Sequence, residues 1–378
     1  MSAAGADARE PHPAMGTRVL MLAPSFLADR RHKRVHGAEV FNLALARQLV
    51  GAGCEVVVGA EPMWAAEFEK HWGDLLAGPG ADAGAGVLRV VYGPHLRKPL
   101  PVSIGVAARL AGERPFDLLI LGNVARGVLP AARLLRTLGK ARRWMVISHQ
   151  YPREAYARRL AGLGVEVMAV SEAVARMFRD AGCRDVWVKF GVGSPEAFAP
   201  APRKPAEANP GAPVRFGLVG QLDTPWKGAE RVLRAWSARP DRLRGRAMLH
   251  LCAYKSRPAW SDPDAVFRDW LEPSEVGGFM RGLDVLIVPS SSSETFSQVM
   301  VQGMLAGLPV ISSDLEVLAE KLDTGAGLVF HDETELTAHI ARLAEDPAAR
   351  ATMGAEARRV ALERYVWRIE DFIARYLA

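Results

Sequence analysis

The feature that most constrains this chain is its repeated alternation of a short apolar run, a turn and a helical stretch. Strands that alternate with helices predict parallel sheets covered by helices on both faces. In the first half, helical segments such as 40–50, 127–138 and 172–181 separate most of the runs. The seven expected strands there are Arg18–Leu22, Glu55–Val58, Leu88–Val91, Asp117–Leu121, Trp144–Ser148, Glu166–Val170 and Val186–Lys189.

A proline-rich segment, residues 199–213, interrupts this alternation. Its five prolines in fifteen residues exclude a helix or a central strand, so we interpret it as a linker. We expect a loose leader over 1–15, an N-terminal domain over 16–200 and a C-terminal domain over 201–365. The second domain repeats the alternation, with strands expected at Arg215–Val219, Met248–Leu251, Val285–Pro289, Pro309–Ser312 and Leu328–Phe330.

The predicted fold class is therefore α/β, with two doubly wound domains facing each other across a cleft. Doubly wound domains bind ligands outside the carboxyl ends of their strands. We therefore expect the functional site in the cleft between the two domains.

The composition excludes several other classes of protein. Hydrophobic residues make up 49% and charged residues 24%, which is typical of a soluble globular enzyme and not of a disordered chain. No window of about 18 apolar residues predicts a transmembrane helix, and the start lacks the apolar stretch of a secretory signal. Three dispersed cysteines, Cys54, Cys183 and Cys252, exclude a disulfide framework and a CxxC zinc site. They favour core positions in a cytoplasmic protein.

The net charge of +6, from 48 basic and 42 acidic residues, is modest and uneven. Basic clusters at 30–34, at 97–98 and over 133–143 could attract anions. No nucleic-acid-binding motif accompanies them, so we expect no nucleic-acid partner and interpret Arg133–Arg143 as a solvated face.

Two glycine-containing turns follow expected strands. Gly37 lies in His36–Asn42 after the first strand, at the start of a helix whose free amides would attract phosphate. Gly220 and Gln221 end the strand at 215–219, and Lys227 precedes the next helix, where its charge could neutralise a diphosphate.

The segment 289–311 carries the strongest signal. A buried strand ends at Pro289, a polar serine-rich loop follows, and a helix is expected from about Ser297. Amides at the start of a helix have no intrahelical partner and can receive a phosphate. Glu294, just before this helix, can accept hydrogen bonds from hydroxyl groups, and Gln302 lies about a turn and a half inside it.

Together these motifs resemble the family-4 retaining glycosyltransferases of the GT-B fold, over residues 17–378. The family's N-terminal glycine loop resembles His36–Glu39, its mid-domain histidine resembles His149, and its "SxAV" helix resembles Ser171–Val174. Its "VGRL…KG" motif resembles Val219–Leu222 with Lys227 and Gly228, and its Glu-x7-Glu motif aligns with Glu294 and Gln302. The segment 366–378 is similar to the family's helix that crosses back onto the N-terminal domain.

The resemblance implies two Rossmann-like domains, a nucleotide-sugar donor held mainly by the C-terminal domain, and no metal or other cofactor. Catalysis would fall to Glu294, His149 and Lys227. The residues implied in donor binding are Gly37, Gly220, Gln221, Lys227, Phe296, Ser297, Gln298, Val299 and Gln302.

Three positions depart from the family pattern. The family has an arginine that shares the diphosphate with the lysine where this chain has Gln221, and a ribose-binding glutamate where it has Gln302. Its asparagine is also replaced in the turn Gly191–Ser194. The loss at Gln302 is mild, because glutamine still hydrogen-bonds a hydroxyl. The change at Gln221 removes a charge whose contact is worth about 1.5–3 kcal/mol. Either Lys227 and the helix amides suffice without it, or a basic residue of Arg30–Arg34 replaces it.

The segment 293–304 resembles the family branch found in aminoglycoside pathways, which implies UDP-N-acetylglucosamine as donor and the aminocyclitol 2-deoxystreptamine as acceptor. A cationic acceptor needs carboxylates, and Glu39, Glu154 and Glu172 are the candidates in the N-terminal domain.

Two other functions stay open. A lipid or polysaccharide acceptor would use Arg30–Arg34 with Phe26 and Leu27 as a surface for weak membrane association. A non-catalytic nucleotide-sugar-binding module would explain Gln221 and Gln302.

Two further motifs are weak evidence for any function. Gly191–Glu196 resembles a dinucleotide fingerprint, but it lacks the third glycine and comes late in its domain. His32 and His36 have a helical metal spacing without an acidic partner. The sequence predicts no oligomeric state.

Overall fold

The computed structural model describes residues 14–26, 37–76, 86–96, 98–200, 211–220, 222–252, 259–269 and 271–378. The chain divides into two compact units. The first comprises the chain up to Val170, Val174–Val188 and Arg368–Ala378, and the second comprises Ser171–Ala173 and Lys189–Trp367.

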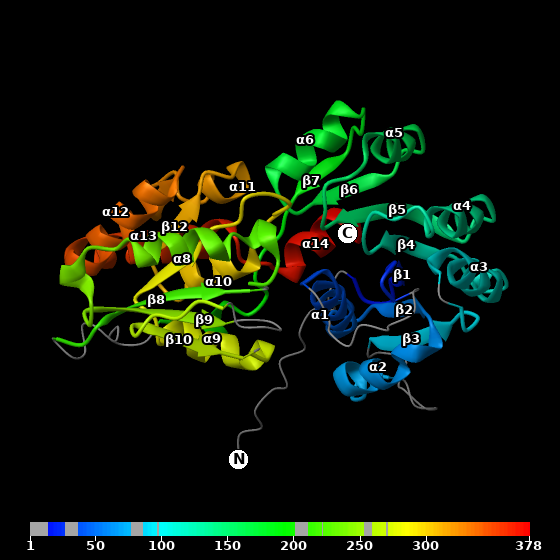
Figure 1. The fold of residues 1–378 in the computed structure, drawn as a ribbon. Coiled ribbons are helices and arrows are strands. Elements are labelled where there is room, and N and C mark those ends of the chain that lie inside the picture. Colours follow the sequence, from blue (N-terminus) through cyan, green and yellow to red (C-terminus); the bar gives the residue numbers. More distant parts are fainter. Residues whose placement is uncertain are drawn as a thin grey trace, which may run out of the picture. The chain divides into compact units, whose positions relative to one another are not determined.

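The first unit is built on a parallel sheet of seven described strands, in the order β3-β2-β1-β4-β5-β6-β7 (Figure 1). The interior strand β1 is buried at every position, as expected for a strand covered on both faces. All seven expected strands are confirmed, with small shifts at their ends. Their bounds are β1 Arg18–Leu22, β2 Glu55–Ala60, β3 Val87–Tyr92, β4 Phe116–Leu121, β5 Ala141–Ser148, β6 Glu166–Ala169 and β7 Val186–Val188.

Helices connect these strands, and their apolar faces pack on the sheet. In α4, for example, Leu129, Ala132 and Leu135 are buried, at the spacing of one helix face. The helices are α1 Gly37–Gly51, η1 Pro62–Trp64, α2 Ala65–Trp72, α3 Pro99–Leu110, α4 Leu129–Thr137, α5 Glu154–Gly162 and α6 Glu172–Asp180.

The second unit is built on a parallel sheet of six described strands, in the order β10-β9-β8-β11-β12-β13 (Figure 1). Five of them are the expected strands of the C-terminal half. The sixth, β10, is a short and partly exposed edge strand that the sequence did not predict. The bounds are β8 Val214–Val219, β9 Ala247–Cys252, β10 Ala265–Arg268, β11 Val285–Val288, β12 Val310–Ser313 and β13 Gly327–Phe330.

The helices of the second unit follow the same pattern. Phe216 of β8 meets Trp236 of α8 edge-on, with ring centroids 5.6 Å apart, in the core between sheet and helices. The helices are η2 Pro195–Phe198, η3 Pro225–Lys227, α8 Ala229–Ser237, η4 Asp241–Leu243, α9 Pro273–Arg281, α10 Gln298–Leu305, α11 Glu316–Ala319, α12 Glu333–Glu345 and α13 Pro347–Arg364.

The strand order reverses once in each sheet, between β1 and β4 in the first unit and between β8 and β11 in the second. At such a switch point the two following connections leave on opposite faces of the sheet. A crevice therefore opens outside the carboxyl ends of the two strands, and this is where doubly wound domains bind ligands.

The last helix, α14 (Ile369–Tyr376), returns to the first unit. Its residues Phe372, Ile373 and Tyr376 are buried. Arg143 of β5 donates a hydrogen bond of 2.8 Å to the carbonyl oxygen of Tyr376. The C-terminal end of the chain is therefore part of the first unit's core.

The second unit begins at Lys189, earlier than the predicted boundary near residue 200. The physical reason is aromatic packing. The Phe190 ring lies edge-on to that of Phe296, 4.8 Å between centroids, and Phe198 is buried. Most of the linker and most of the leader lie outside the described residues.

All three cysteines are buried free thiols, as predicted. Burial raises the pKa of both Cys54 and Cys252 to about 12, so these thiols stay protonated and unreactive at neutral pH. In the described part of the chain, no helix combines the length and apolar character needed to cross a membrane.

Candidate functional site

Lys227 is held at the switch point of the second unit by the turn that follows β8. The turn contains η3 and ends at Gly228, which has the left-handed φ of +73°. A Cβ atom at Gly228 would lie 2.1 Å from the carbonyl oxygen of Pro289, so only glycine lets this turn approach the end of β11. The amide of Ser291 donates a 2.8 Å hydrogen bond to the carbonyl oxygen of Trp226 and fixes the approach.

Glu294 lies in the loop after β11 and meets Lys227 directly. The Nζ atom of Lys227 is 2.6 Å from Oε2 of Glu294, and the hydroxyl of Ser290 donates to the same oxygen at 3.3 Å. The side chains are 26% and 12% exposed, so the pair is largely shielded from water but remains reachable. Lys227 also lies 4.4 Å from the centre of the Trp226 ring, a cation–π distance.

The backbone on both sides of Glu294, up to the start of α10, is strained. Ser293 and Ser297 have φ values of +58° and +66°, which non-glycine residues rarely adopt. Such strain costs about 1–3 kcal/mol per residue and is concentrated at binding and catalytic sites. Here it places Glu294 beside the first turn of α10.

The N-terminus of α10 is available for an anion. Its cap residue, Ser297, makes no side-chain capping hydrogen bond. The first amides of a helix have no partner inside it, and the helix dipole adds partial positive charge there. A phosphate at this point would receive hydrogen bonds from amides near Gln298 and Val299.

Gln298 and Gln302 lie four residues apart on α10 and therefore share one face of the helix. Both are half-buried. On the opposite face, a Cβ atom at Gly303 would lie 2.4 Å from a methyl group of Leu286, so this helix packs tightly on β11. The face that carries the two glutamines can offer amide donors and acceptors to a polar ligand.

Phe296, a predicted donor-binding residue, has a side chain buried in the second unit's core. Its ring meets those of Phe190 and Tyr365, with centroids 4.8 and 5.9 Å away. Any contact of Phe296 with a ligand therefore has to come from its backbone. The ring anchors the loop that holds Glu294.

Lys321 is a residue of this site that the sequence analysis missed. Its side chain is fully buried, with Nζ 5.0 Å from the Phe296 ring centre and 5.2 Å from that of Tyr365. Nζ donates hydrogen bonds of 2.6 Å to the Val317 carbonyl and 3.2 Å to Glu320.

Burial lowers the pKa of Lys321, while attraction from Glu320 and Glu294 opposes this effect. Lys321 thus adds a second positive charge behind Glu294.

In the first unit, Gly37 begins α1 and half-buried Glu39 lies in its first turn. Helix α1 is tied to the sheet at Asn42, whose side-chain amide donates a hydrogen bond of 3.0 Å to the carbonyl oxygen of Gly122, just after β4. These residues lie at the switch point between β1 and β4.

His149 follows β5 at the same carboxyl edge. Its ring packs against Phe41 with centroids 5.3 Å apart, and its amide donates to the side-chain oxygen of Asn123 at 3.4 Å. Burial of the imidazole lowers the pKa of His149 to about 3. The imidazole is therefore neutral at physiological pH and can exchange hydrogen bonds but supplies no charge.

The three predicted acceptor carboxylates stand at the starts of three helices. Glu39 is in α1, Glu154 begins α5 and Glu172 begins α6. Glu154 is exposed and already pairs with Arg158 at 2.5 Å. Glu172 is exposed and groups with the second unit.

Some predicted residues lie outside the described part of the chain: Gln221, Leu27, Arg30–Arg34, His32 and His36. The structure explains Gly191 differently from a dinucleotide motif. A Cβ atom there would lie 2.2 Å from the Tyr365 carbonyl oxygen, beside the hydrogen bond of 2.9 Å from Val192 to that oxygen. Within the described residues, no group of three or more His, Cys, Asp or Glu side chains could hold a metal ion.

The Lys227–Glu294 site can therefore bind a molecule with an anionic part and a hydroxyl-bearing part next to each other. Lys227 and the start of α10 would receive the anion. The carboxylate oxygens of Glu294 would accept hydrogen bonds from the hydroxyl groups.

Comparison with known proteins gives a result that fits this chemistry. Residues 213–346 match the family described as "Glycosyl transferases group 1". The matched region contains Lys227, Glu294 and Gln302. A comparison with curated proteins finds no match.

Solved structures similar to this chain include HepE of Anabaena in complex with UDP and glucose, with 17% identity, a TM-score of 0.65 and coverage of 93% of this chain and 96% of that one. Sucrose-phosphate synthase of Thermosynechococcus elongatus is 18% identical with a TM-score of 0.69, and the match covers 93% of this chain and 95% of that one. A glycosyltransferase of Rickettsia africae is 14% identical with a TM-score of 0.68, and the match covers 93% of this chain and 94% of that one.

These likenesses confirm the predicted fold class. The chain is an α/β protein of the GT-B fold, with two parallel-sheet units, and residues 213–346 of its second unit are similar to the group 1 glycosyl transferases.

Replacing Gly228 with alanine should lower the free energy of unfolding by about 1–3 kcal/mol more than replacing Gly245. Both glycines have nearly the same φ, +73° and +71°, but a Cβ atom at Gly245 meets nothing within 4 Å. The difference, measured by urea denaturation, reports the contact with Pro289. Equal losses in the two variants would contradict the close approach.

The lowered pKa of His149 predicts a pH-dependent stability. The neutral form is favoured in the folded state, so its stabilisation is complete above about pH 6.5 and is lost as the pH falls toward 3. Between pH 7 and pH 5, wild type should lose roughly 1–2 kcal/mol of unfolding free energy relative to His149→Phe. Denaturation curves at both pH values measure this, and a constant difference would rule out a buried neutral imidazole.

Proposed function

We propose that this chain is a retaining glycosyltransferase that uses a nucleotide-sugar donor. The Lys227–Glu294 pair at 2.6 Å, beside the uncapped start of α10, carries the proposal. In a nucleotide sugar the diphosphate and the sugar are covalent neighbours. A cation and a carboxylate in contact are therefore spaced to bind these two parts of one molecule.

We place the donor on the second unit. Lys227 and the amides near Ser297–Val299 bind the diphosphate, with Gly220 and Gln221 in the turn before them. Glu294 holds the sugar hydroxyls, and Gln302 reaches a ribose hydroxyl from the face it shares with Gln298. UDP is the proposed nucleotide, since HepE was solved in complex with UDP and glucose.

The reaction exchanges one bond at the anomeric carbon. The bond from this carbon to the diphosphate oxygen breaks, and a bond to the acceptor oxygen forms on the same face. The acceptor's proton passes to the departing diphosphate. Lys227 and the helix amides lower the barrier by stabilising charge on that diphosphate, which is the main contribution expected for such a site. His149, being neutral, contributes a hydrogen bond to the sugar, and Gly37 allows the backbone of α1 to approach the phosphates. No metal takes part in this scheme.

The proposed transfer is of N-acetylglucosamine to a hydroxyl of a small aminocyclitol such as 2-deoxystreptamine, in antibiotic biosynthesis. Its support is the resemblance over 293–304. Glu39 and Glu172 are the carboxylates proposed for the acceptor's ammonium groups, while Glu154 would first have to leave Arg158.

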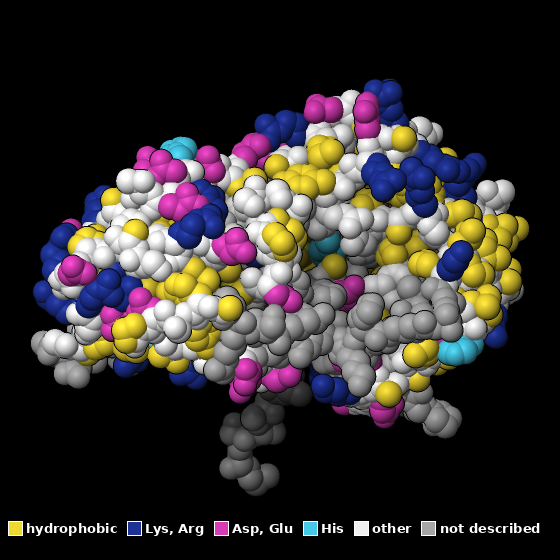
Figure 2. Space-filling model, viewed as in Figure 1, with side chains coloured by type: hydrophobic (Ala, Val, Ile, Leu, Met, Phe, Trp, Pro, Cys, Tyr) yellow, Lys and Arg dark blue, Asp and Glu magenta, His cyan; other side chains and the backbone are white. Residues whose placement is uncertain are grey.

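A lipid acceptor is the second candidate, and an exposed apolar surface favours it. Leu100 and Ile104 of α3, and Leu134 and Leu138 at α4, are 37–49% exposed. In Figure 2 hydrophobic side chains gather over the region where Figure 1 labels these two helices. Large apolar patches rimmed by charge are typical of membrane or partner contacts.

A transfer screen tests these candidates. UDP- and GDP-sugars would be crossed with aminocyclitols and lipid acceptors, and the products detected by mass spectrometry. Transfer to an aminocyclitol supports the first candidate, and transfer to lipid only supports the second. Donor binding without transfer to any acceptor would favour the non-catalytic module and overturn the proposal.

Lys227→Ala should weaken UDP binding by about 10–100-fold, because a charged hydrogen bond to the diphosphate is worth roughly 1.5–3 kcal/mol. Calorimetry with UDP alone measures this effect without any acceptor. Lys98→Ala removes an exposed lysine of the first unit and serves as the control. Equal affinities in the two variants would exclude Lys227 from the diphosphate site.

Glu294→Gln should lower turnover by at least about 100-fold, the usual loss when one preorganised polar group of such a site is removed. Glutamine keeps the volume and an acceptor for Ser290, so the protein should stay folded; Glu294→Ala should lose transfer altogether. Glu230→Gln, a matched change of an 89% exposed carboxylate in α8, is the control. Near-normal turnover of Glu294→Gln would remove this residue from the mechanism.

A further inference from the structure

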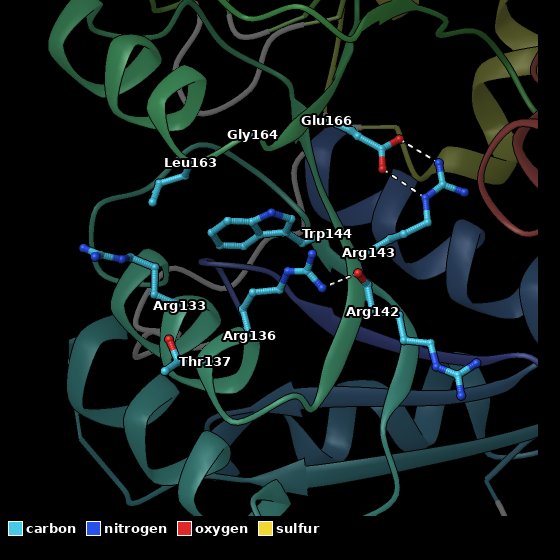
Figure 3. Close-up of a pocket in the computed structure, with 9 residues that line it drawn as sticks. All are labelled: Arg133, Arg136, Thr137, Arg142, Arg143, Trp144, Leu163, Gly164 and Glu166. Carbon is cyan, nitrogen blue, oxygen red and sulfur yellow. Dashed lines mark hydrogen bonds and ion pairs between the residues drawn. The ribbon is translucent and has the colours of Figure 1, made fainter.

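A pocket in the first unit collects four arginines around one tryptophan. The cavity has a volume of about 350 Å³ and lies between the end of α4, the start of β5 and the loop before β6 (Figure 3). Its lining consists of Arg133, Arg136, Thr137, Arg142, Arg143, Trp144, Leu163, Gly164 and Glu166.

Two of these arginines already have carboxylate partners. Arg143 forms a two-pronged ion pair with Glu166, at 3.0 and 2.8 Å, and in Figure 3 its side chain turns toward that residue. Arg142 pairs with Asp117 at 2.8 Å. Their charges are therefore largely balanced.

The other two arginines have no balancing carboxylate among the residues that the structure describes. Arg136 donates hydrogen bonds to the carbonyl oxygens of Ala141 and Arg142, which are neutral acceptors. Arg133 is exposed, and no described residue pairs with it. The two lie three residues apart on α4, so they share one face of the helix. Two positive charges this close repel each other, and an anion bound between them would relieve that repulsion.

The pocket's size and chemistry limit what it can bind. Ligand pockets for drug-sized molecules span about 300–1,000 Å³, so 350 Å³ suits a small anion or a headgroup rather than a whole nucleotide sugar. Guanidinium groups match phosphate oxygens with paired hydrogen bonds. The indole of Trp144, from β5, and Leu163 add an apolar wall.

The pocket lies at the edge of the sheet opposite to His149. Arg142, Arg143 and Trp144 begin β5, whereas His149 follows its end. Ser148 comes four residues after Trp144 along the strand, which is about 13 Å at roughly 3.3 Å per residue. This pocket is therefore separate from the residues to which we assign transfer.

We propose that this pocket is a binding site for a phosphate monoester group, carried either by a small soluble molecule or by an anionic lipid headgroup. Arg133 and Arg136 hold the phosphate oxygens, and the remainder of the ligand lies against Trp144 and Leu163. Exposed Leu134 and Leu138 continue along the same end of α4, at 38% and 49% exposure, where a lipid chain would pass.

The test compares Arg133→Gln with Arg109→Gln in the full-length protein. Both changes neutralise an exposed arginine in a helix of the first unit, but only Arg133 lines the pocket. Arg133 is preferred to Arg136 because it caps no carbonyl group. Inorganic phosphate binding is measured by calorimetry at low salt, and co-sedimentation is measured with phosphatidic acid vesicles and with neutral phosphatidylcholine vesicles.

We expect wild type and Arg109→Gln to bind inorganic phosphate saturably, and Arg133→Gln to bind it about tenfold more weakly. Loss confined to the phosphatidic acid vesicles would identify a lipid headgroup as the source of the phosphate. Phosphate bound only at the Lys227 site would be insensitive to Arg133→Gln. Equal binding of both probes by Arg133→Gln and Arg109→Gln therefore overturns the pocket proposal. It would leave the glycosyltransferase proposal unaffected. If the wild-type protein binds neither inorganic phosphate nor phosphatidic acid vesicles, the pocket proposal is also overturned.

Discussion

The ion pair between Lys227 and Glu294 is the interaction on which the candidate site depends. It joins the connections that follow two neighbouring strands, β8 and β11, at the point where the strand order reverses. Neither strand positions its charged residue alone. The pair forms because Gly228 lets one turn touch the Pro289 carbonyl, and because Ser291 bonds to Trp226 across the gap.

Several features around this ion pair oppose folding because each raises the free energy of the folded state. Two serines with positive φ flank Glu294, and a lysine is buried behind it against two aromatic rings. A buried ammonium is tolerated only with partners, which here are a backbone carbonyl and Glu320. Because strain and buried charge both oppose folding, their coincidence around one carboxylate indicates that this position serves binding or chemistry.

Much of this architecture could be predicted from the sequence, because buried parallel strands appear as short apolar runs between turns. Gly182 illustrates the local signals, since its φ of +93° after α6 fits the expected end of that helix. Strand β10 could not be predicted, because an edge strand with half-exposed residues has no distinctive pattern. The start of the second compact unit at Lys189 could not be read from the sequence, because Phe190 packs on Phe296, a contact 106 residues distant that no local pattern encodes. Lys321 was missed for a related reason: its importance comes from rings that tertiary packing brings to it.

Strand β5 shows how one element can serve two chemistries. At its start, successive arginines face a shallow basic pocket, and at its end a histidine is buried in neutral form against Phe41. In a parallel sheet these ends lie on opposite edges, so a charged group at one end acts weakly on a titrating group at the other. Salt screens the charge acting on a buried group such as His149 only weakly. Its pKa of about 3, however, lies so far below neutral pH that a shift of about one unit would leave the imidazole uncharged. The basic edge can therefore attract anions while the imidazole at the opposite edge stays uncharged, and a phosphate held there would not alter the protonation of His149.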